Sequence, residues 1–322
     1  MTLEGCYLGV DGGGTKTEAL IADAWGHVLG RGLAGPSNPY FVAGRAALRA
    51  IDAAIRAART QAGQPSIIRA ALCVPGLRRH YDIDTLAREL GLGVEGLVVE
   101  GDDRSSFYGA LGGEHGAVVL AGTGSFAMGV NRAGEQVSVG GWGPILGDEG
   151  SGYWIGLHAL RAVIRAHEGR GPATLLTSLV MAHYALSDIA ELRARVYGER
   201  ESQRGISALV PLVLQAAEAG DASAARIIAD AGEALAALGI TVVRQLGMDS
   251  ADYDLVLAGG VSRLGRWVSE PFRAAVRAVC SAINMRGPRL SPAGGAVMLA
   301  LRAGGVAWTS KVLGNLVEAS IG

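Results

Sequence analysis

Gly9-Val10-Asp11-Gly12-Gly13-Gly14-Thr15-Lys16-Thr17 is the stretch around which the chain is organised. An apolar run, Cys6–Val10, leads into an aspartate and three glycines. Because glycine has no Cβ, its backbone can turn with positive φ and bring N–H groups close to an anion. The hydroxyl and lysine side chains that follow are also phosphate donors. The stretch therefore predicts a phosphate-binding loop, whose candidate residues are Gly12, Gly13, Gly14, Thr15 and Lys16.

The residues after the glycines decide which kind of phosphate loop this is. A helix follows the loop in a dinucleotide fold or a P-loop. Here Glu18–Asp23 has the pattern of a strand, Gly26 marks a turn, and His27–Gly30 has the pattern of a second strand. A P-loop also has glycine directly before its lysine, where this chain has Thr15. We therefore expect a phosphate loop at the tip of a β-hairpin; the alternative is an ordinary glycine-rich hairpin.

The stretch resembles the first phosphate motif of the actin-like ATPase superfamily, which includes sugar kinases, actin and heat-shock chaperones. The form Asp11-Gly12-Gly13-Gly14-Thr15-Lys16-Thr17 is similar to one branch, the N-acetylglucosamine kinases and the related BadF/BadG ATPases. This resemblance implies an α/β protein with the actin-like ATPase fold. In that fold two ribonuclease H-like domains flank a nucleotide and sugar cleft.

Composition agrees with a globular enzyme. The 322 residues suffice for two domains, and 49% are hydrophobic and 18% charged. The net charge of −1 gives no basic footprint for nucleic acid or an anionic membrane. Without a basic, apolar leader or an 18-residue apolar run, the sequence predicts a cytoplasmic protein with no membrane partner. Lys16 and Lys311 are its only lysines.

A second strand–loop–strand–turn–strand unit follows the first. Ala117–Ala121 is an apolar run, Gly122-Thr123-Gly124-Ser125 is a glycine-rich loop with hydroxyls, and Phe126–Val130 and Glu135–Val139 are strand patterns separated by a turn. Thr123, Gly124 and Ser125 are candidate phosphate donors. Two copies of one layout predict two similar domains, each with a phosphate loop.

The expected N-terminal domain spans residues 1–115, to which the C-terminal helix of residues 305–322 returns. The expected C-terminal domain spans residues 116–304 and carries a helical insert at about 157–247. Within it we expect helices at Asp188–Tyr197 and Ile206–Ala219. Further along, we expect a helix that begins near Pro271 and a short strand at Pro288–Pro292.

A pair of carboxylates stands where a strand ends and a helix begins. Gly96–Glu100 is the strand pattern, and Asp102 and Asp103 start the helix. A helix N-terminus favours an ionised carboxylate, which could accept a proton from a sugar hydroxyl. Either aspartate could instead be the N-cap. The resemblance favours Asp102 as the catalytic base and as a contact to the sugar, because the family's aspartate precedes a Gly-Ala pair by seven residues.

A glycine-rich segment with apolar side chains precedes the next helix. It runs Gly140-Gly141-Trp142-Gly143-Pro144-Ile145-Leu146-Gly147-Asp148-Glu149-Gly150-Ser151. Its apolar side chains lead us to expect that the loop packs on something. Asp148 and Glu149 lie where a helix starts and could cap it. The segment also closely matches the sugar-binding loop of the N-acetylglucosamine kinases, and this implies sugar contacts from Trp142, Gly143, Asp148 and Glu149.

Two further segments gain a role from the resemblance. Asn38, in the loop Gly35–Pro39, is either a turn residue or a sugar contact. Gly259 and Gly260 follow the strand Asp254–Ala258 and resemble the family's adenosine motif. Asp11 is the expected anchor for Mg²⁺, through water, because Mg²⁺ keeps much of its hydration shell.

Together these features predict an ATP-dependent kinase that phosphorylates an amino sugar, N-acetylglucosamine or glucosamine, at the 6-hydroxyl. Its cofactors would be ATP and Mg²⁺, and a homodimer is plausible by analogy. The alternative is a BadF-type ATPase that activates a partner dehydratase or reductase and holds an iron–sulfur cluster through cysteines. Cys6, Cys73 and Cys280 offer no pair with cluster spacing. A non-catalytic sugar sensor is a third class, whose relatives carry a DNA-binding helix pair before the phosphate loop; only five residues precede Cys6 here.

Overall fold

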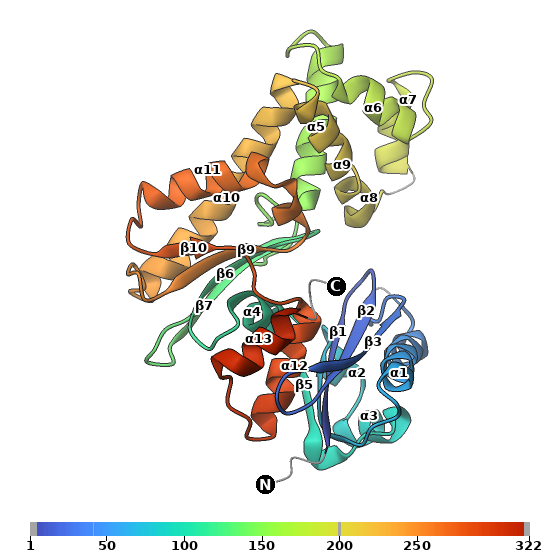
Figure 1. The fold of residues 1–322 in the computed structure, drawn as a ribbon. Helices are drawn as coiled ribbons and strands as arrows, with labels where there is room; N and C mark the ends of the chain where they lie inside the picture. The colour runs from blue at the N-terminus through green and yellow to red at the C-terminus, as the bar shows by residue number, and fades with distance from the viewer. Residues whose placement is uncertain (1–4, 41, 199–200, 319–322) are drawn as a thin grey trace. The chain divides into compact units, whose positions relative to one another are not determined.

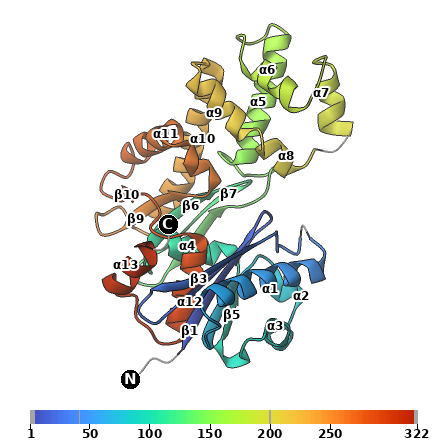
Figure 2. The same cartoon turned by 45° about the vertical axis from the view of Figure 1, so that its right-hand side comes forward.

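The computed structural model describes residues 5–40, 42–198 and 201–318. Its contacts divide the chain into two compact units. Unit 1 consists of Met1–Glu114 with Pro288–Gly322, and unit 2 of His115–Gly287. Figures 1 and 2 show a sheet with helices in each unit.

Unit 1 is built on a five-stranded sheet in the order β3-β2-β1-β4-β5. The strands are β1 (Cys6–Gly12), β2 (Thr17–Ala22), β3 (Val28–Ala34), β4 (Ile67–Cys73) and β5 (Leu97–Glu100). The first three are antiparallel neighbours, and β4 and β5 run parallel to β1. The carboxyl ends of β1, β4 and β5 therefore lie along one edge, where α/β proteins place their binding residues.

Helices cover both faces of this sheet. On one face, α1 (Gly44–Gln61) and α3 (Ile83–Leu90) bury the apolar side chains of alternate strand residues, such as Leu8, Val10 and Leu72. On the other, α12 (Pro292–Ala303) packs on β1 and on α4 (Asp102–Leu111). A short helix α2 (Leu77–His80) follows β4, and a 3₁₀ turn η1 (Val94–Gly96) precedes β5.

The C-terminal segment belongs to unit 1 from Pro288 onward. The tail helix α13 (Ser310–Glu318) packs at the β2–β3 turn, where Asn315 Nδ2 donates to the carbonyl of Trp25 at 2.7 Å. The expected division differs here, because it placed residues 288–304 with the second domain. The small side chains of α12 allow its backbone to approach β1 and α4 closely, and this packing draws the segment into unit 1.

Unit 2 repeats the same sheet. Its order is β10-β9-β6-β7-β8, from β6 (Gly116–Ala121), β7 (Ser125–Val130), β8 (Gln136–Gly140), β9 (Asp254–Ala258) and β10 (Asn284–Arg286). Again the first three strands are antiparallel, and the last two run parallel to the first. Both units thus have the strand order and directions of a ribonuclease H-like domain, as the duplicated layout predicts.

The helices of unit 2 form one apolar core with this sheet. The long helix α10 (Ala222–Gln245) packs on β6 and β7, and α11 (Arg266–Arg277) packs on α10. The other helical segments are α5 (Gly152–His167), α6 (Leu176–His183), α7 (Glu191–Arg193), η2 (Ala194–Gly198), α8 (Gln203–Ser207), α9 (Val210–Glu218) and η3 (Gly260–Leu264). The side chain of Asp221 caps α10, accepting from the Ala224 amide at 2.9 Å.

Several expected element boundaries were wrong. The helix expected at 206–219 is two helices, because Pro211 has no N–H to donate and stands at the start of α9. The segment 188–197 forms only the short α7 and a π-turn. Helix α11 begins at Arg266 and contains Pro271 in its interior rather than at its start. The strand expected at 288–292 lies earlier, at Asn284–Arg286.

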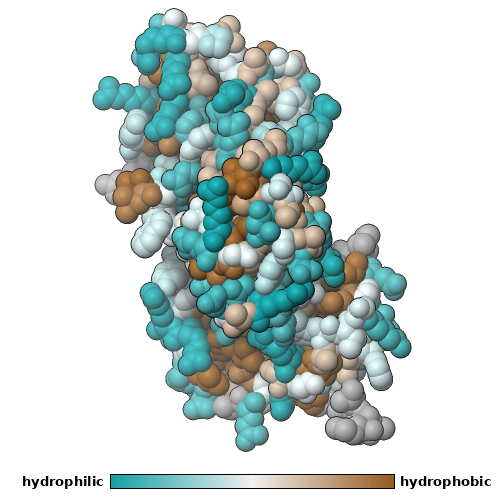
Figure 3. Space-filling view, turned by 90° about the vertical axis from the view of Figure 1, so that its left-hand side faces the viewer, coloured by the Kyte–Doolittle hydropathy of each residue, from teal (hydrophilic) through white to brown (hydrophobic). Residues whose placement is uncertain are grey.

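Polar side chains cover most of the face shown in Figure 3, and they separate the apolar areas. No helix within residues 5–40, 42–198 and 201–318 combines the length and apolar character that crossing a membrane requires.

Close packing of α12 on α4 gives a stability test. A Cβ at Gly295 would lie 1.9 Å from the carbonyl oxygen of Ser105 and 2.5 Å from the amide of Gly109. Because both are backbone atoms, the helices must move apart. We expect Gly295→Ala to lower the free energy of unfolding by about 1–3 kcal/mol in urea denaturation.

Gly314, within α13, is the matched control, because a Cβ there would meet nothing within 4 Å. Gly314→Ala should be neutral or stabilise the protein by up to about 1 kcal/mol. Equal effects of the two substitutions would contradict the packing assigned to α12.

Candidate active site

The carboxyl group of Asp11 is buried where β1 ends. Ser105, on α4, donates its hydroxyl to Asp11 Oδ1 at 2.7 Å. Burial raises the pKa of Asp11 to about 7, the Ser105 hydrogen bond opposes this rise, and the nearby charges of Asp102 and Glu18 add to it. A group with this pKa is poised between its two protonation states near neutral pH.

Asp102 occupies the first turn of α4, after the carboxyl end of β5. Burial raises its pKa to about 6, and the charge of Asp103 adds to the rise. The Ser105 hydroxyl also lies 3.0 Å from the carbonyl oxygen of Asp102. Ser105 therefore ties the start of α4 to Asp11, and Asp11 and Asp102 are close enough to interact electrostatically. Asp102 is thus the better placed of the two candidate bases.

Lys16 makes an ion pair inside the hairpin. Its Nζ lies 2.8 Å from Glu18 Oε2, and Glu18 Oε1 accepts from Arg31 Nε at 2.8 Å. Glu18 is buried, whereas the Lys16 side chain is 57% exposed. Thr15 is exposed beside it, and Gly13 and Gly14 are half-buried. The lysine is therefore held at the loop by a buried carboxylate.

The loop that contains Asn38 is bound to the glycine loop. The amides of Ser37 and Asn38 both donate to the carbonyl of Gly13, at 3.1 and 3.2 Å. Asn38 is buried, and its Oδ1 accepts from the Tyr40 amide at 3.0 Å, so it stabilises a turn. The hydroxyl of Ser37 is fully buried and has no hydrogen-bond partner. These contacts place Asn38 beside the predicted phosphate loop.

In unit 2 the second glycine loop is joined to the Asp148 segment. Asp148 Oδ1 accepts from the Ser125 amide at 3.2 Å, and the Ser125 hydroxyl donates to the Glu149 carbonyl at 2.7 Å. A Cβ at Gly124 would lie within 3.0 Å of the Asp148 carboxylate. The amide of Gly152 donates to the carbonyl of Gly122 at 2.8 Å. The donors of Ser125 thus hold the two loops together.

Asp148 is buried and has φ of +60°, one of three non-glycine residues with positive φ in the described part of the chain. Burial raises the pKa of its carboxyl group, and the Ser125 amide lowers it. Ser151, not Asp148, is the N-cap of α5, accepting from the Trp154 amide at 3.1 Å. Capping therefore does not explain a carboxylate at position 148.

Around Asp148 the loop exposes its apolar residues. Trp142, Ile145 and Leu146 are 74%, 91% and 76% exposed, and Glu149 is exposed as well. The expectation that these side chains pack on something is wrong for this structure. Gly143 has φ of +81° and bends the loop next to Trp142.

Gly259 and Gly260 follow β9, at the same edge of the sheet as the Gly122–Gly124 loop. A Cβ at Gly259, where φ is +94°, would lie 2.4 Å from the Ala121 carbonyl oxygen. A Cβ at Gly260 would meet nothing within 4 Å. The position predicted for the adenosine contact is therefore open on one side.

Two residues with important contacts were missed from the sequence, Ser105 and Glu18. Ser105 comes one helical turn after Asp102, so it lies on the same face of α4, and this spacing was the available signal. All six residues of β2 are buried, Glu18 among them, and the sequence pattern gave no sign that this carboxylate pairs with Lys16.

Among the described residues, no group of three or more histidine, cysteine, aspartate or glutamate side chains is arranged to hold a metal ion. Mg²⁺ that enters with a nucleotide needs only one or two carboxylates, because phosphates and water supply its other ligands. The single buried carboxyl of Asp11 is consistent with that mode.

Comparison with protein families matches residues 8–300 to the BadF/BadG/BcrA/BcrD ATPase family. The chain belongs to this family. An N-acetylmuramic acid/N-acetylglucosamine kinase from Clostridium acetobutylicum is 30% identical over 91% of this chain and 97% of its own length. An N-acetyl-D-glucosamine kinase from Dictyostelium discoideum is 32% identical over 79% of this chain and 84% of its own length.

Solved structures agree on the fold. A candidate N-acetylglucosamine kinase from Chromobacterium violaceum has a TM-score of 0.73 and 28% identity, covering 92% of this chain and 98% of its own. A ROK family glucokinase from Streptomyces griseus, solved with glucose and AMPPNP, has a TM-score of 0.60 at 18% identity, covering 92% of this chain and 98% of its own. The second likeness shows the fold alone.

Burial of Asp11 makes the stability of this BadF/BadG family protein depend on pH. The folded protein binds more protons than the unfolded chain between the ordinary pKa of 3.8 and about 7. Stability without ligands should therefore fall as pH rises through that range and level off above it. Asp11→Asn removes this pH dependence. Between pH 4 and pH 8 the free energy of unfolding of the variant should therefore rise relative to that of wild type by on the order of a few kcal/mol.

Urea denaturation at several pH values measures the difference. Asp82→Asn is the control, because hydrogen bonds from Thr85 lower the pKa of that N-cap carboxyl and its contribution has the opposite sign. Parallel pH profiles for Asp11→Asn and wild type would show that Asp11 is not buried as described.

Proposed function

We propose that the protein is an ATP-dependent kinase that phosphorylates an amino sugar, N-acetylglucosamine or glucosamine, at the 6-hydroxyl. The observation that carries the proposal is Asp102, in the first turn of α4, whose carboxyl group has a pKa of about 6. The Ser105 hydroxyl that bonds the carboxyl of Asp11 also lies 3.0 Å from the backbone carbonyl oxygen of Asp102. The names of the relatives, N-acetylmuramic acid/N-acetylglucosamine kinase and N-acetyl-D-glucosamine kinase, support the choice of acceptor. A glucosamine kinase from Vibrio cholerae is also related, 31% identical over 55% of this chain and 61% of its own length.

Asp102 acts as the general base in this proposal. A carboxylate with a pKa near 6 is mostly ionised at neutral pH, yet it remains basic enough to accept the proton of a sugar hydroxyl as that oxygen attacks phosphorus. The first turn of α4 favours its charged form. The hydrogen bond between Ser105 and the carbonyl of Asp102 holds the base in register with Asp11.

The remaining roles follow the chemistry of each group. The Thr15 hydroxyl is suited to a phosphate oxygen. The Gly13 amide donates to the Lys16 carbonyl at 3.0 Å and so shapes the Gly12–Gly14 loop, and a Cβ at Gly13 would meet nothing within 4 Å, which leaves room for a phosphate beside the backbone. Lys16 contributes positive charge from its ion pair with Glu18. Thr123 and Gly124 provide the corresponding donors in unit 2, where the Ser125 hydroxyl and amide hold the loop in shape. The open backbone at Gly260, beside Gly259, is suited to the adenosine.

Mg²⁺ bound with ATP supplies positive charge that offsets the charge of the transferring phosphoryl group. Asp11 would hold it through water. Its buried carboxyl has a raised pKa, so a nearby cation would stabilise the ionised form. The family's description as ATPases agrees with nucleotide use.

Sugar contacts are proposed for Asn38 and Asp102 in unit 1, and for Trp142, Gly143, Asp148 and Glu149 in unit 2. Asp148 keeps a buried carboxylate in a conformation that only a few non-glycine residues adopt, which is typical of functional positions. Exposed Trp142 offers an apolar face of the kind that stacks on sugar rings.

The activator of a partner dehydratase is the less favoured alternative. Such a protein would share an iron–sulfur cluster through surface cysteines. All three cysteines of this chain are buried, and burial raises the pKa of each thiol. None offers an exposed thiolate to a cluster.

Sugar-dependent ADP release from ATP and Mg²⁺ tests the proposal. Wild-type protein should release ADP with N-acetylglucosamine or glucosamine, and Asp102→Asn should lower kcat by about 10²–10⁴-fold. Because the base must be ionised, wild-type kcat should fall as pH drops below about 6.

Asp103→Asn is the matched neighbour in the same helical turn and should keep most of the activity. ADP release that needs no sugar would instead favour the partner-activating ATPase. A protein whose activity survives Asp102→Asn but not Asp103→Asn would move the base to the second aspartate.

A further inference from the structure

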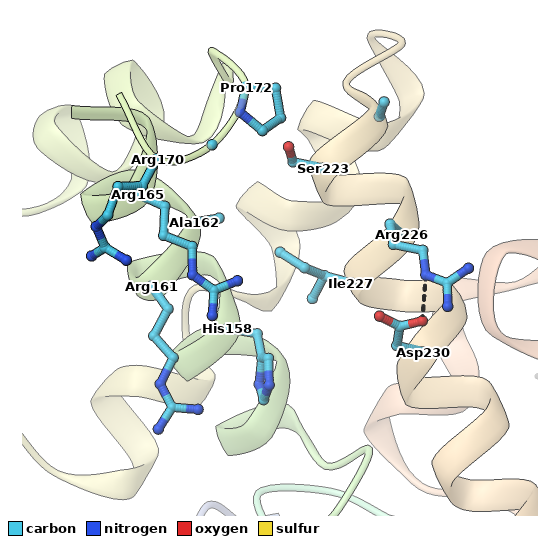
Figure 4. Close-up of a pocket in the computed structure, with 12 residues that line it drawn as sticks. His158, Arg161, Ala162, Arg165, Arg170, Pro172, Ser223, Arg226, Ile227 and Asp230 are labelled. Atoms are coloured by element: carbon cyan, nitrogen blue, oxygen red, sulfur yellow. Dashed lines mark ion pairs between the residues drawn. The ribbon is translucent and has the colours of Figure 1, made fainter. Parts of the chain in front are cut away.

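A cavity that opens to solvent lies within unit 2, away from the loops described above. It has a volume of about 420 Å³ and is lined by α5, the loop that follows α5 and the start of α10. Figure 4 shows arginine side chains on the α5 side, with Ser223, Arg226 and Asp230 of α10 opposite them. Its size is within the range of small-molecule sites.

The lining of this cavity is strongly basic. Arg161 and Arg165 project from α5, Arg170 from the loop and Arg226 from α10, and Asp230 is the one carboxylate among the lining residues. Arg226 Nε pairs with Asp230 Oδ1 at 2.6 Å. Positive charge therefore exceeds negative charge by a wide margin.

Two of these arginines have no counter-ion. Arg170 pairs with Glu168 outside the cavity. Within the described residues, neither Arg161 nor Arg165 forms an ion pair or a hydrogen bond. They stand four residues apart on one face of α5, where both side chains are exposed, so their like charges repel weakly and a bound anion would offset this repulsion.

Another cavity in the molecule shows that this imbalance is specific. A space of about 380 Å³ between α1 and α3 is also lined by arginines, namely Arg45, Arg49 and Arg56. There Asp52 and Glu89 line the same space, and Arg56 Nε pairs with Asp52 at 2.9 Å. Abundant arginine in the sequence does not by itself produce an unbalanced pocket.

His158 adds a neutral donor or acceptor at the cavity. Its Nδ1 lies 2.8 Å from the Trp154 carbonyl oxygen, which can only accept, so Nδ1 carries a proton and Nε2 is left for other partners. The ring stacks on Trp154 with centroids 3.6 Å apart. Burial lowers the pKa of His158, and the charges of Arg161 and Arg165 lower it further.

We propose that this cavity is a binding site for a phosphomonoester. Each planar guanidinium group can donate two hydrogen bonds to two oxygens of a tetrahedral phosphate dianion. The Ser223 hydroxyl and His158 Nε2 would contact neutral parts of the ligand, such as hydroxyl groups. A neutral sugar would gain nothing from the charges of Arg161 and Arg165, whereas a phosphoryl group would pair with both.

Two sources could supply this chemistry: the sugar phosphate that the proposed kinase reaction produces, or another phosphorylated small molecule. Isothermal titration with inorganic phosphate and with N-acetylglucosamine 6-phosphate separates them. Tighter binding of the sugar phosphate than of phosphate at the arginine-dependent site would identify the reaction product as the ligand. Equal binding would assign recognition to the phosphoryl group alone.

Arg161→Gln and Arg165→Gln test the site directly. Each should weaken phosphate binding at least tenfold, and Arg165→Lys, which keeps the charge but not the forked donors, should retain part of the affinity. Arg45→Gln, in the cavity where Asp52 and Glu89 offset most of the arginine charge, is the control and should bind phosphate as wild type does. Circular dichroism of each variant would establish that it folds.

Sugar phosphate could also bind at the proposed active site, and in that case wild type would show two sites and the arginine variants one. Phosphate binding that is unchanged in both glutamine variants, or absent from wild type at millimolar concentration, would overturn the proposal. The inorganic phosphate experiment does not require kinase activity, so this result and a failure of the proposed function can be distinguished.

Discussion

The hydrogen bond from Ser105 to the buried carboxyl of Asp11 is the contact on which the arrangement of unit 1 depends. A carboxyl group without a partner at this depth would destabilise the fold, and one hydroxyl satisfies part of its need. The same hydroxyl meets the carbonyl of Asp102, so one serine sets the start of α4 against the end of β1. Helix α12 packs on both α4 and β1, and its small residues allow its backbone to approach the Ser105 carbonyl and Gly109. The Ser105 side chain therefore both bonds the carboxyl of Asp11 and positions helix α4.

Unit 2 solves the corresponding problem differently. Its glycine loop is held by a segment that follows later in the chain. The Asp148 carboxylate accepts a hydrogen bond from the Ser125 amide, and the Ser125 hydroxyl donates to the carbonyl of Glu149. The same strand order thus supports two kinds of loop. In unit 1 the carboxyl group beside the glycine loop is that of Asp11, near the end of β1. In unit 2 it is that of Asp148, in the segment before α5.

Much of the architecture could be predicted from the sequence. The apolar patterns of the strands and the two copies of the glycine-rich loop depend on residues that are close together in the chain. The strand Asp254–Ala258 was expected with the bounds observed. The predicted roles of Asp102 and Asp148 rest on the resemblance, because local pattern alone allows capping at both positions. Contacts between residues far apart in the sequence could not be predicted, namely Ser105 with Asp11 and Glu18 with Arg31. The packing of residues 288–304 with unit 1 was missed for the same reason, because a small-residue helix carries no signal of its partner. The basic cavity was missed as well, because its arginines come from segments about sixty residues apart.

Lysine is so scarce in this chain that the ion pair at the phosphate loop has a practical consequence. Lys16 and Lys311 are the only two, and they lie in different surroundings: Lys16 beside buried Glu18, and Lys311 over the ring of Trp25 with its Nζ 5.4 Å from the centroid. An amine-acylating reagent would therefore modify only two side chains of this protein, those of Lys16 and Lys311. The extent of modification at Lys16, normalised to Lys311 in the same peptide digest, would report ligand occupancy of the loop from the wild-type protein, without a mutation or an attached dye.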